Sequence, residues 1–360
     1  MAPFPEGNQT SSAIQGQTLT RVQTLSKLSD AVTALTRDEL LERMATFAAA
    51  NDPLPGLEPY VNQRPMSVGL AFEGVSLFSF LRESHPHQDP EPWRRAMSEG
   101  RISVDGRPVR DPNRPVRAGN RVLHEIPNTT EPWVNPAVGF IYEDEQILVL
   151  DKAAPLPMHP CGRFNKNSLV PMLRAAFEGL EPRPVHRLDA DTTGVVVLAK
   201  QKEAARRLGE QFESRRTDKR YLARVHGTIE ADEIELFGRI AREPNSAGKR
   251  RLLSDEAAGR QAETSLRVLE RCDDSTLVEL RPHSGRTNQL RIHLAELGHP
   301  IVGDSAYGKG AAPLGVDEAM SGRSDLCLHA WKLRLEHPAD GRKLEFIAEA
   351  PQWGRAGRIG

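Results

Sequence analysis

The sequence predicts an α+β protein whose main domain contains a mixed, largely antiparallel sheet with flanking helices, preceded by a smaller module. From Val138 onward, short β-branched segments alternate irregularly with helical stretches, without the strand–helix–strand rhythm of a parallel sheet. Neither a Gly-x-Gly-x-x-Gly sequence nor a Walker-type loop occurs, so a nucleotide-binding fold has no support. A chain of 360 residues is long enough for roughly two to three domains.

Composition restricts the class of protein further. The 48 Lys and Arg residues nearly balance the 49 Asp and Glu residues, which excludes a chain that is basic throughout. The three cysteines form no CxxC pair, so neither a disulfide framework nor a zinc ribbon is expected. No apolar run approaches the roughly 18 residues of a membrane span, and the N-terminal residues do not resemble a secretory signal. We therefore expect a cytoplasmic protein with no membrane partner.

Residues 1–67 are predicted to be a polar tail followed by a helical extension. Apolar residues recur at helical spacing from Leu19 to Leu35 and predict an amphipathic helix. Thr36 and Glu39 then form a capping-box pattern ahead of a second helix, which ends at Asp52-Pro53. We expect this helical pair to pack on a later domain, and docking on a partner is the alternative.

Residues 68–126 are predicted to form a separate small module. Helices over Leu77–Glu83 and Trp93–Glu99 precede short strands that are joined by the turn Asp105-Gly106, a dipeptide typical of tight hairpins. Between residues 94 and 121, eight arginines occur with only three acidic residues. Either a solvated, loop-rich face or a module whose guanidinium groups bind phosphates explains this local charge.

Residues 127–355 are predicted to be the main domain. A helix is expected over Thr287–Leu297, with Ser284-Gly285 leading into it. Strands are expected at Phe140–Tyr142, Ile147–Asp151, Val195–Ala199, Tyr221–Val225, Thr264–Leu269 and Thr276–Leu280, with two more near the end of the chain.

A polar turn before an apolar strand supplies the first candidate site residue. Asp189 lies in the turn that precedes the strand Val195–Ala199, which would hold its carboxylate rigidly at a cleft. Arg187, two residues away, favours the ionised carboxylate, which acts as a nucleophile or base when sheltered. Taken alone, Asp189 is also explained as the cap of a Thr-Thr-Gly turn, and His186 as a hydrogen-bonded structural histidine.

Two other segments are rich in cations. Arg286 and Arg291 lie at the start of the predicted helix Thr287–Leu297, and a helix N-terminus with guanidinium groups suits a phosphate or a carboxylate. Between residues 200 and 224, nine basic residues occur with four acidic residues. Tyr221 lies within this basic run, a combination that suits RNA bases stacking on aromatic faces. Alone, Tyr221 is also explained as a core tyrosine.

Together, these segments resemble the Rlu-type (RluA) family of RNA pseudouridine synthases. The family pattern H-R-L-D-x-x-T-S-G matches His186 to Gly194 with one substitution, and K-x-Y-x-A-x-V-x-G matches Lys219 to Gly227 without change. A longer pattern that begins T-G-R-T-H-Q-I-R and ends G-D-x-x-Y-G runs from Ser284 to Gly308 with three substitutions. The pattern L-H-A-x-x-L is present from Leu328 to Leu333, and an altered form of the family's opening motif spans Glu143 to Pro155.

The small module is similar to the α-L RNA-binding domain first known from a ribosomal small-subunit protein. The similarity rests on a helix, the hairpin sequence EGRISVDGRPV and the later sequence VRAGNRV. An α-L domain ahead of the catalytic domain is also the common arrangement in the Rlu-type family.

The resemblance implies a pseudouridine synthase fold with a central active-site cleft. It implies an enzyme that isomerises specific uridines of structured ribosomal or transfer RNA to pseudouridine, with no cofactor and no metal. The reaction detaches uracil from ribose and rejoins it through carbon. A catalytically inactive ribosome- or tRNA-binding protein of the same fold is the alternative, and a nucleoside glycosidase would need a second catalytic acid. We expect RNA as the partner and a monomeric protein.

The resemblance also assigns roles to residues of this chain. Asp189 would be the essential carboxylate, by covalent attack or by assisting glycosidic cleavage. Arg291 would pair with Asp189, keep it ionised and help to occupy the gap left by the flipped nucleotide. Tyr221 would stack on the uracil near the proton lost from carbon 5. Arg187 and Arg286 would hold phosphates or the active-site loop, and the further predicted substrate-binding residues are Gln289, His186 and Leu328.

Overall fold

The computed structural model describes residues 22–24, 33–86, 88–242, 250–253, 259–308 and 325–355. It separates into two compact units. The small unit is Gly56–Glu131, and the large unit is formed by the described residues before and after it.

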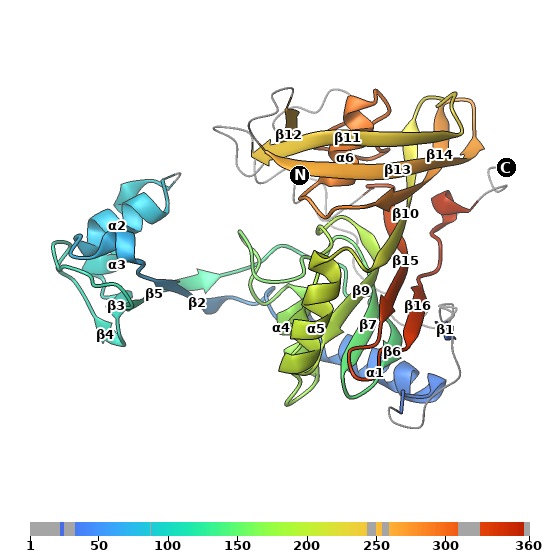
Figure 1. The fold of residues 1–360 in the computed structure, drawn as a ribbon. Coiled ribbons are helices and arrows are strands. Elements are labelled where there is room, and N and C mark those ends of the chain that lie inside the picture. The colour runs from blue at the N-terminus through green and yellow to red at the C-terminus, as the bar shows by residue number, and fades with distance from the viewer. Residues whose placement is uncertain are drawn as a thin grey trace, which may run out of the picture. The chain divides into compact units, whose positions relative to one another are not determined.

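One sheet of twelve strands forms the framework of the large unit (Figure 1). Its main path has the order β12-β11-β13-β14-β10-β15-β9-β7-β6, while β8 pairs with β9, and β16 with both β15 and β1. The pairing of β15 with β9 is parallel and the other pairings are antiparallel. This mixed, largely antiparallel sheet confirms the predicted α+β class. The strands are β1 Val22–Thr24, β6 Gly139–Glu143, β7 Ile147–Lys152, β8 Arg183–Pro184, β9 Thr193–Ala199, β10 Asp218–His226, β11 Glu233–Arg242, β12 Arg250–Leu253, β13 Arg260–Arg271, β14 Ser275–Pro282, β15 Leu328–Glu336 and β16 Lys343–Ile347.

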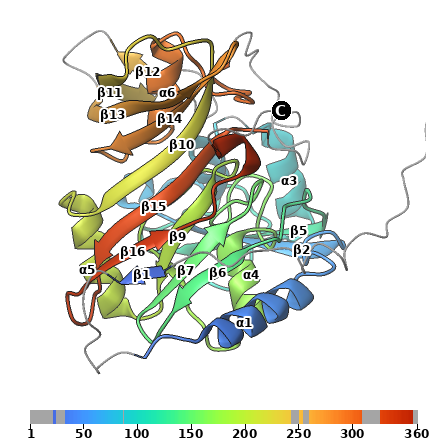
Figure 2. The ribbon, with the colours of Figure 1, turned by 90° about the vertical axis from the view of Figure 1, so that its right-hand side faces the viewer.

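Helices pack on both faces of this sheet (Figure 2). Side chains alternate between the faces of a strand, so Leu148 and Val196 enter one core while Val149 and Val197 enter another. The first core also contains residues of α1 and α4, and the second contains residues of α5. A third core joins α6 to β10, β13 and β14. The helices are α1 Arg37–Ala50, α4 Leu169–Ala176, α5 Lys202–Glu213 and α6 Gln289–Glu296, with a short 3-10 helix at Gln352–Gly354.

The N-terminal extension packs on the large unit through α1. The predicted capping box is present, since Thr36 accepts the amide of Glu39 and Glu39 reaches back to the Thr36 backbone. Arg43 pairs with the buried Glu143 at 2.7 Å. The predicted helix from Leu19 to Leu35 is wrong at Val22–Thr24, which forms β1 because this segment adds a strand to the edge offered by β16. Most of the remaining segment lies outside the described residues.

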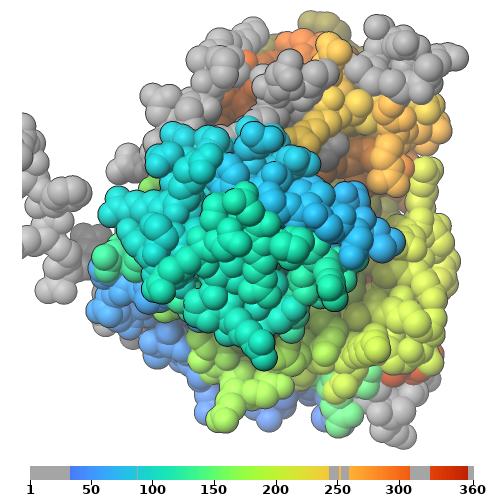
Figure 3. Space-filling view, turned by 90° about the vertical axis from the view of Figure 1, so that its left-hand side faces the viewer, coloured from blue at the N-terminus to red at the C-terminus, as the bar shows by residue number. Residues whose placement is uncertain are grey.

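The small unit is a four-stranded sheet of order β2-β5-β3-β4 with two helices, and its surface runs from blue through cyan to blue-green in Figure 3. Asp105 and Gly106 both have positive φ, 49° and 77°, which confirms the predicted tight turn between β3 and β4. Leu77, Phe80 and Trp93 are buried in its core. The elements are β2 Tyr60–Ser67, a 3-10 helix Leu70–Phe72, α2 Leu77–Ser84, α3 Pro90–Ser98, β3 Ile102–Val104, β4 Arg107–Pro108 and β5 Arg121–Thr129.

The compact units differ from the predicted division at residues 67/68 and 126/127. The strand β2 belongs to the small unit because it pairs with β5 from Tyr60 opposite Thr129 to Ser67 opposite Arg121. The helix α1 belongs to the large unit, on which it packs. The predicted extension of residues 1–67 is therefore shared between the two units.

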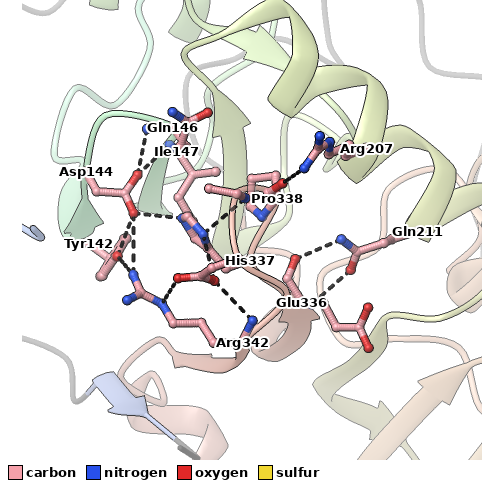
Figure 4. Close-up of polar contacts among 12 residues, drawn as sticks. Tyr142, Asp144, Gln146, Ile147, Arg207, Gln211, Glu336, His337, Pro338 and Arg342 are labelled. Atoms are coloured by element: carbon pink, nitrogen blue, oxygen red, sulfur yellow. Dashed lines mark hydrogen bonds and ion pairs between the residues drawn. The ribbon is translucent and has the colours of Figure 1, made fainter. Parts of the chain in front are cut away.

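A buried polar cluster attaches α5 to the turn between β15 and β16 (Figure 4). The Gln211 amide donates to the backbone carbonyl of Glu336 at 2.8 Å and accepts from its N–H at 2.9 Å. In the same turn, His337 lies fully buried between Asp144, 2.9 Å away, and Asp340, 3.2 Å away. These contacts hold α5 in place, and with it the adjacent Phe212.

Gly194, the last residue of the H-R-L-D pattern, permits the parallel contact between β9 and β15. Its φ is 108°, and a Cβ atom there would lie 2.2 Å from the carbonyl oxygen of Ala330. We expect Gly194→Ala to lower the free energy of unfolding by about 3 kcal/mol. Gly209→Ala is the matched control in α5, where a Cβ has open space, and a gain of about 0.5–1 kcal/mol is expected. Chemical denaturation measures both, and equal stabilities would contradict the steric argument.

Candidate active site

A pocket of about 840 Å³ is lined by the loop before β9, the start of β10, the turn between β14 and α6, and the start of β15. The structure brings all eight predicted site residues to this pocket: His186, Arg187, Asp189, Tyr221, Arg286, Gln289, Arg291 and Leu328. Its charged lining comprises six arginines and one lysine with four carboxylates. The pocket is therefore positive despite the near-neutral chain.

The loop that carries Asp189 is anchored on both sides of the carboxylate. Leu188 is buried in the core beside β9. The backbone carbonyl of Ala190 accepts hydrogen bonds from the Lys152 ammonium at 3.0 Å and from the Leu156 N–H at 2.9 Å. Asp189 is half-buried between these two anchors, and among the described residues no group forms a hydrogen bond or ion pair with its carboxylate. The carboxylate is thus fixed by its backbone and open to a ligand.

Lys152 is a buried lysine beside the Asp189 loop and was not among the predicted site residues. Its Nζ donates to the carbonyls of Ala153, Leu156 and Ala190 at 2.8 to 3.0 Å. Burial lowers the pKa of Lys152 to about 7, although nearby carboxylates, including Asp189, act to raise it. Its place in the altered opening motif of the family was the signal available in the sequence.

His186 anchors the same loop from its other side. Its Nε2 accepts the N–H of Val197 at 2.9 Å, and its ring stacks on Phe212 with centroids 4.6 Å apart. Burial lowers the pKa of His186 to about 3. The ring is therefore neutral, and Nε2 is engaged by the backbone of β9. This geometry fits the structural explanation of His186 that the sequence left open.

Arg291 reaches the pocket from α6, but its ion-pair partner differs from the predicted one. Its Nε and one terminal nitrogen donate to the two carboxylate oxygens of Asp304 at 2.8 and 2.7 Å. The expected pair with Asp189 is not formed, because the buried Asp304 is held by the N–H groups of Ala306 and Tyr307 in the matching fork geometry. Burial acts to lower the pKa of Arg291, yet the bonds to Asp304 and the charge of Asp189 raise it. Asp304 lies within the G-D-x-x-Y-G part of the family pattern, which was the signal for it.

Tyr221 lies in β10, beside a register shift in the pairing with β15. Burial raises the pKa of the Tyr221 hydroxyl, and the negative charge of Asp189 raises it further. The phenol is therefore protonated at neutral pH. Tyr221 lines the pocket and also contacts two hydrophobic cores, which agrees with the description of it as a core tyrosine.

Gln289 is buried and uses its amide within the protein. Its oxygen accepts from the Ser284 hydroxyl at 2.7 Å and the Arg286 N–H at 3.0 Å, and its NH₂ group donates to the Glu263 carbonyl and the Thr264 hydroxyl, both at 2.9 Å. Gln289 therefore fixes the turn that presents Arg286. Of the two remaining predicted residues, Arg187 is exposed beside Asp189 and Leu328 is buried at the start of β15.

The basic run of residues 200–224 is divided by the fold. Arg215 and Lys219 line the pocket. Most of the others pair with carboxylates elsewhere on the large unit, as Arg206 does with Glu203 at 2.6 Å and Arg220 with Glu279 at 2.8 Å. The basic run therefore does not form one continuous cationic surface, because most of its side chains are neutralised by separate carboxylates.

Two buried histidines predict a loss of stability in acid. Burial lowers the pKa values of His293 and His329 to about 4, whereas an exposed histidine has a pKa of about 6.5. Between pH 6.5 and pH 4 the unfolded chain binds more protons than the folded protein does. The free energy of unfolding therefore decreases as the pH is lowered through this range, by up to about 3 kcal/mol for each histidine. Urea denaturation at several pH values measures this fall. His293→Asn removes one titrating ring and should make the dependence shallower, and an unchanged slope would contradict the assignment.

Comparison with known proteins identifies the family. The sequence model for RNA pseudouridylate synthase matches residues 146–296. An uncharacterized RNA pseudouridine synthase of Aquifex aeolicus is 34% identical over 293 residues, which cover 78% of this chain and 92% of that protein. Ribosomal large subunit pseudouridine synthase D of Vibrio cholerae is 35% identical over 269 residues, which cover 71% of this chain and 81% of the relative. Human RNA pseudouridylate synthase domain containing 1 aligns with 60% of this chain and 84% of its own, with 30% identity and a TM-score of 0.49.

The sequence matches define an isomerase that acts on RNA. The chain belongs to the RNA pseudouridine synthase family and is an Rlu-type member of it. Within the described residues, no helix has the length and apolar character needed to span a membrane.

Proposed function

We propose that this enzyme isomerises specific uridines of structured ribosomal or transfer RNA, with Asp189 as the essential carboxylate. The observation that carries this proposal is the half-buried Asp189, unpaired within the described chain, on a loop anchored by Lys152 and His186 in a positive pocket. A rigid carboxylate beside a space large enough for a flipped nucleotide is positioned to act at the glycosidic bond.

The reaction requires different roles of the residues that line the pocket. The bond from ribose to uracil nitrogen breaks, a bond from ribose to carbon 5 forms, and the proton on carbon 5 is lost while nitrogen gains one. Tyr221 stacks on the detached uracil. Because burial keeps its phenol protonated, we assign it to holding the ring and not to acting as a phenolate base. Arg291, oriented by Asp304, supplies a fixed positive charge near Asp189.

The RNA must open locally for the uridine to enter. Flipping a nucleotide out of its stack costs a few kcal/mol, which favours loops and single-stranded junctions as targets. The relatives named for the ribosomal large subunit support ribosomal RNA as the substrate. In the small unit, Arg107, Arg110 and Arg117 are exposed and make no ion pair with the described residues. This supports its predicted role as an α-L RNA-binding domain.

Incubation of the wild-type protein with RNA that carries 5-tritiated uridine tests the activity, because formation of the new carbon bond releases tritium. Ribosomal RNA fragments and transfer RNA are assayed separately, and pseudouridines are mapped in total RNA from a deletion strain. We expect release from ribosomal RNA and loss of the corresponding sites in the strain. Binding without release would favour an inactive RNA-binding protein, and release from transfer RNA alone would reverse the choice of substrate.

A further inference from the structure

Five cations of the pocket form no ion pair with carboxylates of the described residues: Arg187, which lies beside Asp189, and four others. Arg215, Lys219, Arg260 and Arg286 all line the pocket, and within the described chain none of them forms an ion pair. They come from separate elements: Arg215 follows α5, Lys219 lies in β10, Arg260 begins β13, and Arg286 precedes α6. The fold therefore gathers them from distant parts of the sequence, and we call them the rim cations.

The rim cations lie close enough to repel one another. Burial and the charge of Arg215 lower the pKa of Lys219, and burial with the charges of Arg260 and Arg215 lowers the pKa of Arg286. The Arg286 side chain is also held in place, since its Nε donates to the backbone carbonyl of Gln261 at 3.0 Å. The Lys219 ammonium lies near Gly285 in the same turn, 3.9 Å from where a Cβ would stand.

The carboxylates of the same pocket have other neighbours. Asp218 pairs with Arg281 at 2.7 Å and with Arg220 at 3.4 Å. A carboxylate oxygen of Glu263 lies within 4.8 Å of ligand atoms of Glu235 and His283. Glu213 is exposed at the end of α5, and Asp189 lies at the reacting centre. Carboxylates of the described chain therefore neutralise neighbouring cations such as Arg281, and they leave the rim cations without a counter-charge.

Like charges gathered without a counter-charge weaken the folded state unless an anion binds them. We propose that the rim cations form a phosphate-binding site for the backbone of the RNA strand next to the flipped uridine, an inference that rests on the proposed function. Arginine forks match the oxygens of a phosphodiester, and Lys219 adds a point charge on the strand that carries Tyr221. The site thus positions the strand so that the target nucleotide meets Asp189.

The salt dependence of RNA binding tests this site. Removing one cation that binds a phosphate of a single strand reduces the slope of log K against log salt by about 0.7. We expect the double variant Arg215→Gln/Lys219→Gln to reduce the slope by about 1.4, twice that amount, and to weaken binding at low salt. The charge-conserving variant Arg215→Lys/Lys219→Arg should retain most of the slope, an outcome that a purely structural role of these side chains would not produce.

The matched control removes two positive charges from the outer side of α5. Lys202→Gln/Arg206→Gln alters exposed residues that do not line the pocket, and Arg206 is already paired with Glu203, so the wild-type slope is expected. A wild-type slope in the Arg215/Lys219 double variant, or an equal reduction in the control, would overturn the phosphate site. RNA binding is measured without turnover. If the salt dependence changes as expected but no pseudouridine is formed, the result contradicts only the proposed function and leaves the phosphate site standing.

Discussion

Asp189→Asn is expected to abolish release of tritium from RNA that carries 5-tritiated uridine while leaving RNA binding nearly intact. The substitution preserves the size of the side chain but removes the carboxylate that, in the proposed mechanism, attacks or assists at the glycosidic bond. We expect the rate to fall at least about a thousandfold, a reduction typical of removing an essential nucleophile. Single-turnover tritium release measures the rate, and gel-shift titration measures binding.

Asp191→Asn is the matched control, because Asp191 lies in the same loop and does not line the pocket. It should retain most of the activity. Appreciable turnover by Asp189→Asn, or an equal reduction in both variants, would show that the carboxylate has been misassigned.

Lys152→Met should give the second large effect, on both stability and catalysis. Methionine keeps the apolar stem but leaves the carbonyls of Ala153 and Leu156 without the ammonium and deprives Ala190 of one donor. Buried polar groups that lose a charged partner cost about 3 kcal/mol in the free energy of unfolding. Because the Ala190 carbonyl lies next to Asp189, we also expect kcat to fall about tenfold or more.

Lys200→Met separates these two effects. Lys200 binds Glu143 at 2.8 Å and the Asp144 carbonyl at 2.6 Å, near the end of β9 that lies away from Asp189. Its removal should lower the free energy of unfolding without lowering kcat in the folded enzyme. Denaturation and saturation kinetics are measured on both variants. A wild-type kcat in Lys152→Met would limit Lys152 to a role in stability.

Local patterns predicted many elements of the fold, and long-range pairing accounts for two of the differences. The Asp105-Gly106 turn and the Thr36 capping box depend on neighbouring residues, and the structure confirms both. The strand β11, Glu233–Arg242, was not predicted, because its alternating charged and apolar residues depend on pairing with β13. The segment Val22–Thr24 has helical spacing in the sequence, but the exposed edge of β16 determines its conformation.

The site residues that lie in a sequence motif could be predicted. The contacts between residues that are far apart in the sequence could not. The predicted residues all reach one pocket because the motifs are contiguous segments that the sheet brings together. The Arg291 partner was mispredicted, since Asp189 and Asp304 carry the same charge and only the fold decides which one meets the guanidinium. Arg215 and Arg260 lie in no family motif, so only the folded structure shows that both line the pocket.

The position of β15 in the sheet has a consequence for folding. This strand, Leu328–Glu336, lies between β9 and β10, which precede it by more than a hundred residues. During synthesis, the edges of β9 and β10 that later pair with β15 therefore stay unpaired until β15 has been made, and unpaired edges are prone to pair with the wrong strand. Contacts of this sequence separation slow folding. The active site is thus assembled late, when β15 is inserted between strands that were made long before it.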